Sequence, residues 1–329
     1  MRQILEYLLD HQTLSKAEAQ SILTEISNAK FSEAEVISFV TIFLMRSITQ
    51  EEMEGFREAL LGLSLRVDLE TEDLVDIVGT GGDGKNTFNI STLSSFIVAG
   101  TGQKVAKQGN YGSSTLSGAS NVLEKLGYTF KKNEKDLKRD LYETNICFLH
   151  APLFHPALQN VAPLRKQLGI RTFFNLLGPL VNPAYPKYNL IGVANLEIAR
   201  LYQYVTQKEK FRNFMLLHAL DGYDEISLTG DTKIITQGGE KIKSAQDFHY
   251  KNISPNSIFG GDTLEEAAGI FLRILEGKGS EEQNAVVLAN AAVALENTEK
   301  YGNYEECLLR AKESLFSFNA LNCFKKAIK

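Results

Sequence analysis

Residues 74–100 read LVDIVGTGGDGKNTFNISTLSSFIVAG. Their first part, 74–78, is a short apolar run of the kind found in buried strands. A glycine-rich loop follows at 79–84, and the next apolar segment predicts a helix from about Asn89 to Gly100. The stretch therefore predicts a strand, a loop and a helix in direct succession, as in a βαβ unit with parallel strands.

A second copy of this succession follows immediately. Residues 104–106 are predicted to form a strand, and a polar loop at 108–117 leads into a helix with Ser117 as its expected cap and Gly127 at its end. The alternation predicts an α/β fold with a mostly parallel sheet. Further strands are predicted at 146–149, 190–193 and 214–217, a small hairpin around 230–240, and helices around 264–275, 281–296 and 303–316.

The first 65 or so residues predict a separate, helical region. Three capping boxes, in which a Ser or Thr is followed three residues later by Glu, mark helix starts at Ser15, Ser32 and Thr49. The helix over 34–45 is apolar around much of its surface, so it is predicted either to lie in a core or to contact a second subunit. A length of 329 residues also allows two or so domains, because one core usually stops growing at ~250–300 residues.

Composition argues against several classes of protein. The net charge is −5, the pI is about 5.7 and no block of Lys and Arg occurs, which argues against nucleic-acid or anionic-membrane partners. Cys147, Cys307 and Cys323 are few and scattered, which argues against a disulfide framework and a zinc site. The N-terminus lacks the apolar run of a signal peptide and no stretch approaches membrane-spanning length, so we expect a cytoplasmic protein.

Two familiar phosphate-binding motifs overlap the glycine loop at 79–84. Three of its glycines match the dinucleotide fingerprint, but that motif needs an acidic residue after the next strand, where Lys107 stands. The P-loop motif needs Ser or Thr after its Lys, where this chain has Asn86. A loop between a strand and a helix still offers backbone N–H groups to an anion. Glycines that serve only a tight turn are the alternative.

Asp83 is unusual in a phosphate-binding loop, because a carboxylate repels phosphate unless a divalent cation or a sugar hydroxyl lies between them. A second polar loop, 107–115, follows the neighbouring predicted strand, at the edge where open α/β sheets bind ligands. It contains one Lys, one Asn and three small hydroxyl side chains of Ser and Thr, so it predicts a second anion site. Two facing anion sites suit a molecule with phosphates at both ends, such as phosphoribosyl pyrophosphate.

Six motifs occur in order over nearly the whole chain. They are Gly79-Thr80-Gly81-Gly82-Asp83, Asn89-Ile90-Ser91-Thr92, Lys107-x-Gly109-Asn110, Pro163-Leu164-Arg165, the run from Arg171 to Pro183, and Asp221-Gly222-Tyr223-Asp224-Glu225. Together they resemble the successive signatures of the anthranilate phosphoribosyltransferase family. The resemblance implies a small, mainly helical domain, 1–67 plus about 163–187, joined by a hinge to an α/β domain, 68–162 plus 188–329. It also implies a homodimer formed through the small domain.

The activity that the resemblance implies is the magnesium-dependent transfer of a 5-phosphoribosyl group from phosphoribosyl pyrophosphate to anthranilate. The contacts implied for phosphoribosyl pyrophosphate are Gly79, Gly82, Asp83, Thr87, Asn89, Ile90, Ser91, Thr92, Lys107, Gln108, Gly109, Asn110, Tyr111, Gly112, Ser113, Ser114, Thr115 and Ala119. Gly79, Asn110 and Arg165 correspond to anthranilate contacts, and Ser91, Asp224 and Glu225 to ligands of Mg²⁺. No residue is assigned as a general base, because an arylamine is neutral at pH 7.

Each of these roles has a simpler alternative. Lys107 could be a surface lysine, and Arg165 could be a charge on a surface helix. The adjacent carboxylates at 224–225 could belong to a solvated loop. His150 and His155 lack the spacing of a helical metal site, so packing or cleft lining is the interpretation for both.

Two positions depart from the family pattern. Gln108 stands where the family usually has His, and Tyr111 where it often has Arg, both in the loop expected to meet the aromatic substrate. Gln can donate a hydrogen bond, but it lacks the positive charge of a histidine. A relative that uses another aromatic amine is therefore an alternative. A nucleoside phosphorylase of the same architecture and a non-catalytic binding protein are two others. Arg165 and the Asp224-Glu225 pair argue against the phosphorylase.

Overall fold

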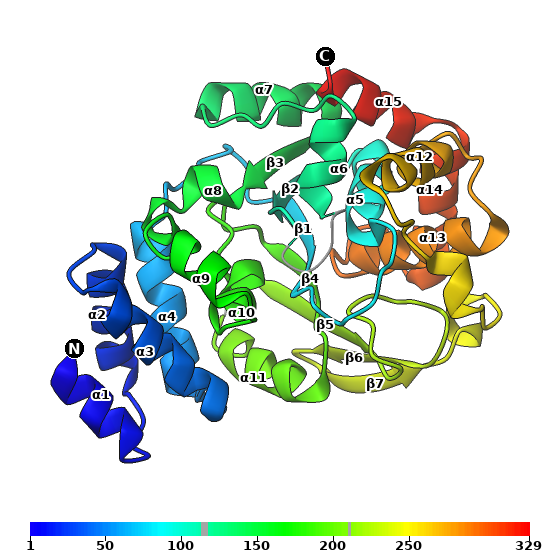
Figure 1. The fold of residues 1–329 in the computed structure, drawn as a ribbon. Helices are drawn as coiled ribbons and strands as arrows, with labels where there is room; N and C mark the ends of the chain where they lie inside the picture. Colours follow the sequence, from blue (N-terminus) through cyan, green and yellow to red (C-terminus); the bar gives the residue numbers. More distant parts are fainter. Residues whose placement is uncertain (113–117, 210–211) are drawn as a thin grey trace. The chain divides into compact units, whose positions relative to one another are not determined.

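The computed structural model describes residues 1–112, 118–209 and 212–329 (Figure 1). The chain folds into two compact units. The first, the helical unit, comprises Met1–Val67 and Ala151–Tyr185, and the second, the α/β unit, comprises Asp68–His150 and Pro186–Lys329. The second segment of the helical unit thus begins at Ala151, earlier in the chain than the expected position near 163, and ends at Tyr185.

The helical unit begins with α1 (Arg2–Leu9), α2 (Lys16–Ser27), α3 (Glu33–Met45) and α4 (Gln50–Leu63). The three predicted capping boxes are confirmed, whereas α1 was not predicted, because no side chain caps its N-terminus. The chain returns with α8 (Ala151–Phe154), η1 (Pro156–Leu158), α9 (Ala162–Leu168), α10 (Phe174–Leu177) and η2 (Gly178–Leu180). Since η1 contacts α2 and α4, the segment before residue 163 also belongs to this unit.

Aromatic rings form the centre of the helical unit. Phe56 and Phe173 are stacked with ring centroids 4.6 Å apart, and α3 contributes Phe39 and Phe43, whose rings meet the stack edge-on. Two alternatives were open for α3, a core helix or a subunit contact. One face of α3 lies in the core, while Met45 at its end is 85% exposed.

A seven-stranded sheet organises the α/β unit, in the order β3-β2-β1-β4-β5-β6-β7. Its strands are β1 (Leu74–Gly79), β2 (Lys104–Gly109), β3 (Ile146–His150), β4 (Tyr188–Gly192), β5 (Asn213–Ala219), β6 (Thr232–Thr236) and β7 (Gly239–Lys243). The pairs among β1 to β5 are parallel, and β6 and β7 continue the sheet beyond β5 as antiparallel strands. The mostly parallel α/β sheet is confirmed, and the predicted hairpin extends it. The hinge stays a prediction.

The helices of the α/β unit are α5 (Ile90–Gly100), α6 (Ala119–Lys125), α7 (Glu134–Thr144), α11 (Leu196–Thr206), α12 (Leu264–Leu275), α13 (Glu281–Glu296), α14 (Tyr304–Phe316) and α15 (Asn319–Ala327), with short turns η3 (Gln246–Phe248) and η4 (Pro255–Ile258). Helix α5 is buried along nearly its whole length and contacts β1, α13 and α15. The expected cap Ser117 lies outside the described residues, and Gly118 precedes α6. Nowhere in the described ranges is a helix long and apolar enough to cross a bilayer.

Candidate active site

The glycine loop (residues 79–84) connects the carboxyl end of β1 to the segment before α5. Gly81, Gly82 and Gly84 have φ angles of 64°, 71° and 72°, in the left-handed region that side chains other than glycine rarely adopt. The N-terminus of α5 follows, where the backbone N–H groups and the helix dipole favour negative charge. The loop and the helix together form a surface suited to an anion.

Asp224 packs against the ends of two neighbouring parallel strands, β1 and β4. The N–H of Gly81 donates to Asp224 Oδ2 at 2.8 Å. A Cβ atom on Gly79 would collide with the Asp224 carboxylate, and one on Gly192 would collide with the Asp224 carbonyl oxygen. Gly79 and Gly192 pair with each other at the strand ends. Both strands must therefore end in glycine for Asp224 to occupy this position.

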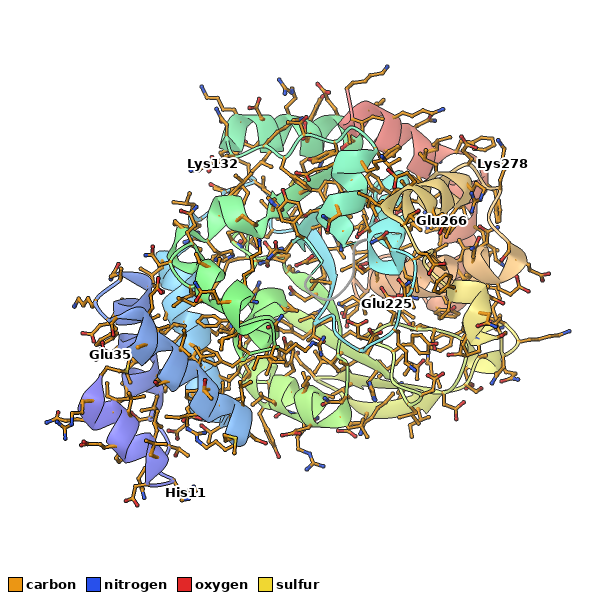
Figure 2. The ribbon with its side chains drawn as sticks, in the orientation of Figure 1. His11, Glu35, Lys132, Glu225, Glu266 and Lys278 are labelled. Carbon is orange, nitrogen blue, oxygen red and sulfur yellow. The ribbon has the colours of Figure 1, made fainter. Side chains whose placement is uncertain are left out.

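Glu225 lies at the N-terminus of α5, where the N–H of Ser91 donates to its Oε1 at 3.0 Å. It is half-buried within the α/β unit and is labelled in Figure 2. Burial, followed by the charges of Asp224 and Asp83, raises the pKa of Glu225 well above its ordinary value, although the Ser91 bond and the charge of Lys107 act in the opposite direction. Negative charge is therefore in excess here, which favours a bound cation.

Lys107 is buried beside this cluster, with 2% of its surface exposed. Its ammonium donates to the carbonyl of Ile77 and, at 3.5 Å, to Ser91 Oγ. Burial lowers the pKa of Lys107 to about 8, while the charges of Asp76 and Glu225 act in the opposite direction. The alternative of a surface lysine is wrong, because protein encloses the side chain. Its direct contact with phosphate stays a prediction.

The expected magnesium ligands Ser91, Asp224 and Glu225 fit that ion chemically. All three offer oxygen atoms, and the raised pKa of Glu225 marks negative charge that a divalent cation would neutralise. Among the residues that the structure describes, no three His, Cys, Asp or Glu side chains gather as a metal site. Mg²⁺ commonly takes only one or two carboxylates together with phosphate and water oxygens. These ligands stay a prediction.

The segment from the glycine loop to α5 holds further expected contacts. Asp83 Oδ1 accepts a hydrogen bond from the N–H of Lys85 at 3.0 Å, and Thr87 pairs with Phe259 in an isolated bridge. Asn89 precedes α5. The first turn of α5 contains Ile90, Ser91 and Thr92. The expected contacts of this segment thus lie between the end of β1 and the start of α5.

The loop between β2 and α6 holds the second set of expected contacts. Gln108 is buried and its N–H donates to Asp76 Oδ1 at 3.1 Å. Asn110 is exposed, and its Oδ1 accepts from the N–H of Tyr111. The Tyr111 hydroxyl donates to Glu124 at 2.8 Å. Gly109 ends β2, Gly112 lies in the loop, Ala119 begins α6, and Ser113, Ser114 and Thr115 lie outside the described residues.

Arg165 lies on α9 of the helical unit, whereas the other expected contacts that the structure describes belong to the α/β unit. Its guanidinium lies 5.5 Å from the ring centroid of Phe174, and burial lowers its pKa. Arg165 is half-buried, so it differs from a freely exposed helix charge. Its contact with anthranilate stays a prediction.

The two histidines lie in different units. His150 ends β3, where its Nδ1 is 3.0 Å from Ser120 Oγ and its ring stacks on Phe130. Burial lowers the pKa of His150, and it lowers the pKa of His155 to about 4. Both rings are buried, which agrees with the prediction of packing or cleft lining for the two residues.

Two residues beside the site were missed in the sequence. Asp76 has 0% exposure in the middle of β1, and Gly192 ends β4 against Asp224. Each left a signal. A charged residue inside an apolar strand implies a buried partner. A glycine inside an apolar strand often marks a place where another part of the backbone approaches closely.

Two family models match most of the chain. The model described as "Glycosyl transferase family, helical bundle domain" matches residues 2–64. The model described as "Glycosyl transferase family, a/b domain" matches residues 71–321. The two matches fall on the N-terminal segment of the helical unit and on the larger part of the chain that contains the sheet.

Named relatives agree with these models. An anthranilate phosphoribosyltransferase from Flavobacterium johnsoniae is 52% identical over 326 residues, which cover 99% of this chain and 98% of the relative. The crystal structure of anthranilate phosphoribosyltransferase from Thermus thermophilus has a TM-score of 0.91 at 28% identity and covers 98% of both chains. The Saccharomyces cerevisiae enzyme of that name, in complex with PRPP and Mg, has a TM-score of 0.88 at 28% identity and covers 96% of this chain and 93% of its own. The chain belongs to the anthranilate phosphoribosyltransferase family of glycosyl transferases.

Proposed function

We propose that the protein transfers the 5-phosphoribosyl group of phosphoribosyl pyrophosphate to the amine of anthranilate and releases pyrophosphate. The observation that carries the proposal is the placement of Asp224 and Glu225 against the glycine loop and the first turn of α5. This placement occurs in a chain that is 52% identical, over 99% of its length, to an anthranilate phosphoribosyltransferase.

The glycine loop and the α5 N-terminus would hold the phosphates, through the contacts that the sequence resemblance implies. Mg²⁺ held by Ser91, Asp224 and Glu225 would neutralise charge on the departing pyrophosphate. The Gly81 and Ser91 amides orient the two carboxylates before substrate arrives, because each donates to one of them. Positioning and charge stabilisation therefore carry most of the catalysis.

Anthranilate would be bound by Gly79, Asn110 and Arg165. The guanidinium of Arg165 can donate two parallel hydrogen bonds to a carboxylate, which orients the aromatic ring. The amine then attacks C1 of the ribose as the bond from C1 to pyrophosphate breaks, and it loses its extra proton afterwards. A strong general base is not required.

Pyrophosphate release with and without anthranilate tests the proposal, with the second product identified by mass spectrometry. We expect release that depends on both Mg²⁺ and anthranilate, together with phosphoribosylanthranilate in equal amount. Release with another aromatic amine, and none with anthranilate, would restrict the proposal to phosphoribosyl transfer. Such a result would place the cause in the substitutions at Gln108 and Tyr111.

The active form is a homodimer that assembles through the helical unit. Helices α1 and α3 contact each other, and they leave Leu9 and Met45 67% and 85% exposed. A strictly monomeric species in analytical ultracentrifugation at micromolar concentration would contradict the dimer.

The protein acts in the cytoplasm, and its three free cysteines are typical of a reducing compartment.

A further inference from the structure

Strands β1 and β2 are joined in two different ways along their length. At the beginning of the pair the backbones are in parallel register, with Val75 opposite Val105. Towards the active site, side chains make the links. The N–H of Gln108 donates to Asp76 Oδ1 at 3.1 Å, and the Lys107 ammonium donates to the Ile77 carbonyl. Two charged side chains therefore join the strands at the end that carries the site.

These side chains connect β1 to the expected magnesium ligands. Asp76 has 0% exposure, and a buried carboxylate needs a compensating charge. The negative charges of Asp76 and Glu225 both act on the Lys107 ammonium and favour its charged form. The Lys107 ammonium also donates to Ser91 Oγ, and the N–H of Ser91 holds Glu225. Hydrogen bonds thus lead from Lys107 to Ser91 and from Ser91 to Glu225, and the charge of Asp76 acts on the same ammonium.

We infer that Asp76 is a positioning residue for the proposed transfer reaction, because it shares the Lys107 ammonium with Glu225 and so keeps the Glu225 carboxylate available to a cation. Without the charge of Asp76, Glu225 becomes the stronger counter-charge for Lys107. The ammonium would then be drawn towards the carboxylate that binds Mg²⁺. The inference rests on the proposed function, since it concerns the metal requirement of that same site.

The test is the Mg²⁺ dependence of Asp76→Asn, which keeps an oxygen to accept from the Gln108 N–H and removes the charge. At saturating phosphoribosyl pyrophosphate, we expect the Mg²⁺ concentration for half-maximal rate to rise roughly five-fold or more, because one charge interaction with a buried ammonium is removed. The rate at saturating Mg²⁺ should change by less than about two-fold, since no reacting group is removed. A Mg²⁺ dependence equal to that of the wild type would overturn the inference.

Asp140→Asn is the matched control. Asp140 is also a buried carboxylate, with 4% of its surface exposed. It lies on α7 and forms an ion pair with Lys131, which is not one of the expected ligands. We expect this variant to lose stability and to keep the wild-type Mg²⁺ dependence. Equal shifts in Asp76→Asn and Asp140→Asn would show that Asp76 has only a structural role, which contradicts the inference.

The Lys107→Met variant shows whether Asp76 acts through Lys107 or only through the stability of β1. In Lys107→Met, the further change Asp76→Asn should not alter the Mg²⁺ requirement, measured by calorimetric binding of phosphoribosyl pyrophosphate. If Asp76→Asn alone does not fold, the double variant, which removes both charges, is expected to fold. A double variant that is also unfolded would contradict charge sharing. A wild-type protein that binds phosphoribosyl pyrophosphate without transferring it would refute the proposed function alone, because binding still tests the role of Asp76.

Discussion

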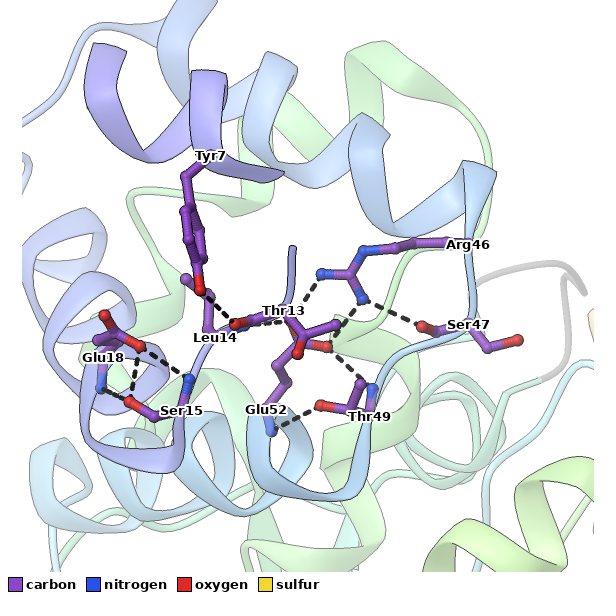
Figure 3. A network of polar contacts seen from close by, with 9 residues as sticks. All are labelled: Tyr7, Thr13, Leu14, Ser15, Glu18, Arg46, Ser47, Thr49 and Glu52. Atoms are coloured by element: carbon purple, nitrogen blue, oxygen red, sulfur yellow. Dashed lines mark hydrogen bonds and ion pairs between the residues drawn. The ribbon is translucent and has the colours of Figure 1, made fainter. Parts of the chain in front are cut away.

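The helical unit and the α/β unit each contain a carboxylate that is at least half-buried, and the charges around the two carboxylates are balanced differently. Glu52 in the helical unit has 0% exposure, and Arg46 donates to both of its oxygens at 2.9 and 2.6 Å (Figure 3). The N–H groups of Leu14 and Thr49 complete the set at 3.0 and 2.9 Å. Burial raises the pKa of Glu52, but these bonds outweigh it, so that its pKa lies below the ordinary value.

Glu225 in the α/β unit has the opposite balance. Burial and the charges of Asp224 and Asp83 raise its pKa, and the Ser91 bond and Lys107 do not offset them. A carboxylate with matched partners stabilises the fold, whereas one with excess like charge is ready to bind a cation. Charge balance therefore separates the two roles more clearly than burial does.

The largest expected effect comes from removing the excess charge. Asp224→Asn combined with Glu225→Gln should lower turnover roughly 1,000-fold, because the leaving pyrophosphate loses its charge stabilisation. The unfolding midpoint should not fall, since both amides keep an oxygen for the Gly81 and Ser91 N–H groups. Steady-state kinetics and thermal unfolding measure the two quantities. Full activity at low Mg²⁺ would refute this role of the carboxylates.

Removing the Arg46 cation from the cluster around Glu52 should lower stability and leave turnover unchanged, which is the opposite result. Arg46→Met leaves Glu52 enclosed without its counter-ion, so the free energy of unfolding should fall by about 3 kcal/mol. The turnover of the folded enzyme at 25 °C should stay close to that of the wild type. Urea denaturation and steady-state kinetics check the pair of outcomes.

Lys16→Met is the matched control for Arg46→Met. Lys16 pairs with Glu58 on the same unit, but both side chains are well exposed, at 44% and 38%. The loss in stability should be about 1 kcal/mol or less. If Arg46→Met costs no more than Lys16→Met, the Glu52 cluster is not the stabilising element that its geometry indicates.

Gly192→Ala tests whether the strand ends position Asp224. An added Cβ would meet the Asp224 carbonyl oxygen, so the backbone that carries the carboxylates must move. We expect the Mg²⁺ requirement to rise about ten-fold, for a loss near 1.4 kcal/mol. Gly62→Ala on α4 is the control, because a Cβ there meets nothing within 4 Å. Wild-type kinetics in Gly192→Ala would show that Asp224 tolerates displacement.

Acid should reduce the stability that the Glu52 carboxylate contributes. The folded pKa of Glu52 lies below its ordinary value of 4.5, so its contribution to stability is complete above that value and is lost as the pH falls through the lower folded pKa. The stability difference between wild type and Glu52→Gln should therefore shrink from roughly pH 5 to pH 3. Urea denaturation at several pH values measures it, and a constant difference would argue against a lowered pKa.

Local patterns were readable in the sequence because they depend on neighbouring residues. The capping boxes at Ser15, Ser32 and Thr49 and the strand before the glycine loop needed only a few positions each. The burial of Lys107 could not be read in this way. The charges that act on its pKa also lie outside the local sequence, since Asp76 is on the neighbouring strand and Glu225 lies more than a hundred residues later. The contact of Gly192 with Asp224 could not be read either, because it joins the end of β4 to the segment that follows β5.

The smallest expected effect concerns Gln108. Gln108→His should lower the Michaelis constant for anthranilate with little change for phosphoribosyl pyrophosphate, by a factor that matches one hydrogen bond, ~0.5–1.5 kcal/mol. Steady-state kinetics with each substrate varied in turn separates the two constants. A lower constant for phosphoribosyl pyrophosphate alone would place this side chain at the phosphates instead of the aromatic substrate.

The central claim is that Asp224 and Glu225 form a cation-dependent substrate site. Its most direct test is calorimetric titration of phosphoribosyl pyrophosphate into wild type and Glu225→Gln, each with and without Mg²⁺. The wild type should bind in the presence of Mg²⁺. Omitting Mg²⁺ or introducing Glu225→Gln should each weaken binding at least about ten-fold, or 1.4 kcal/mol. Glu52→Gln, if folded, should bind like the wild type. Equal affinities for wild type and Glu225→Gln in Mg²⁺ would contradict the account.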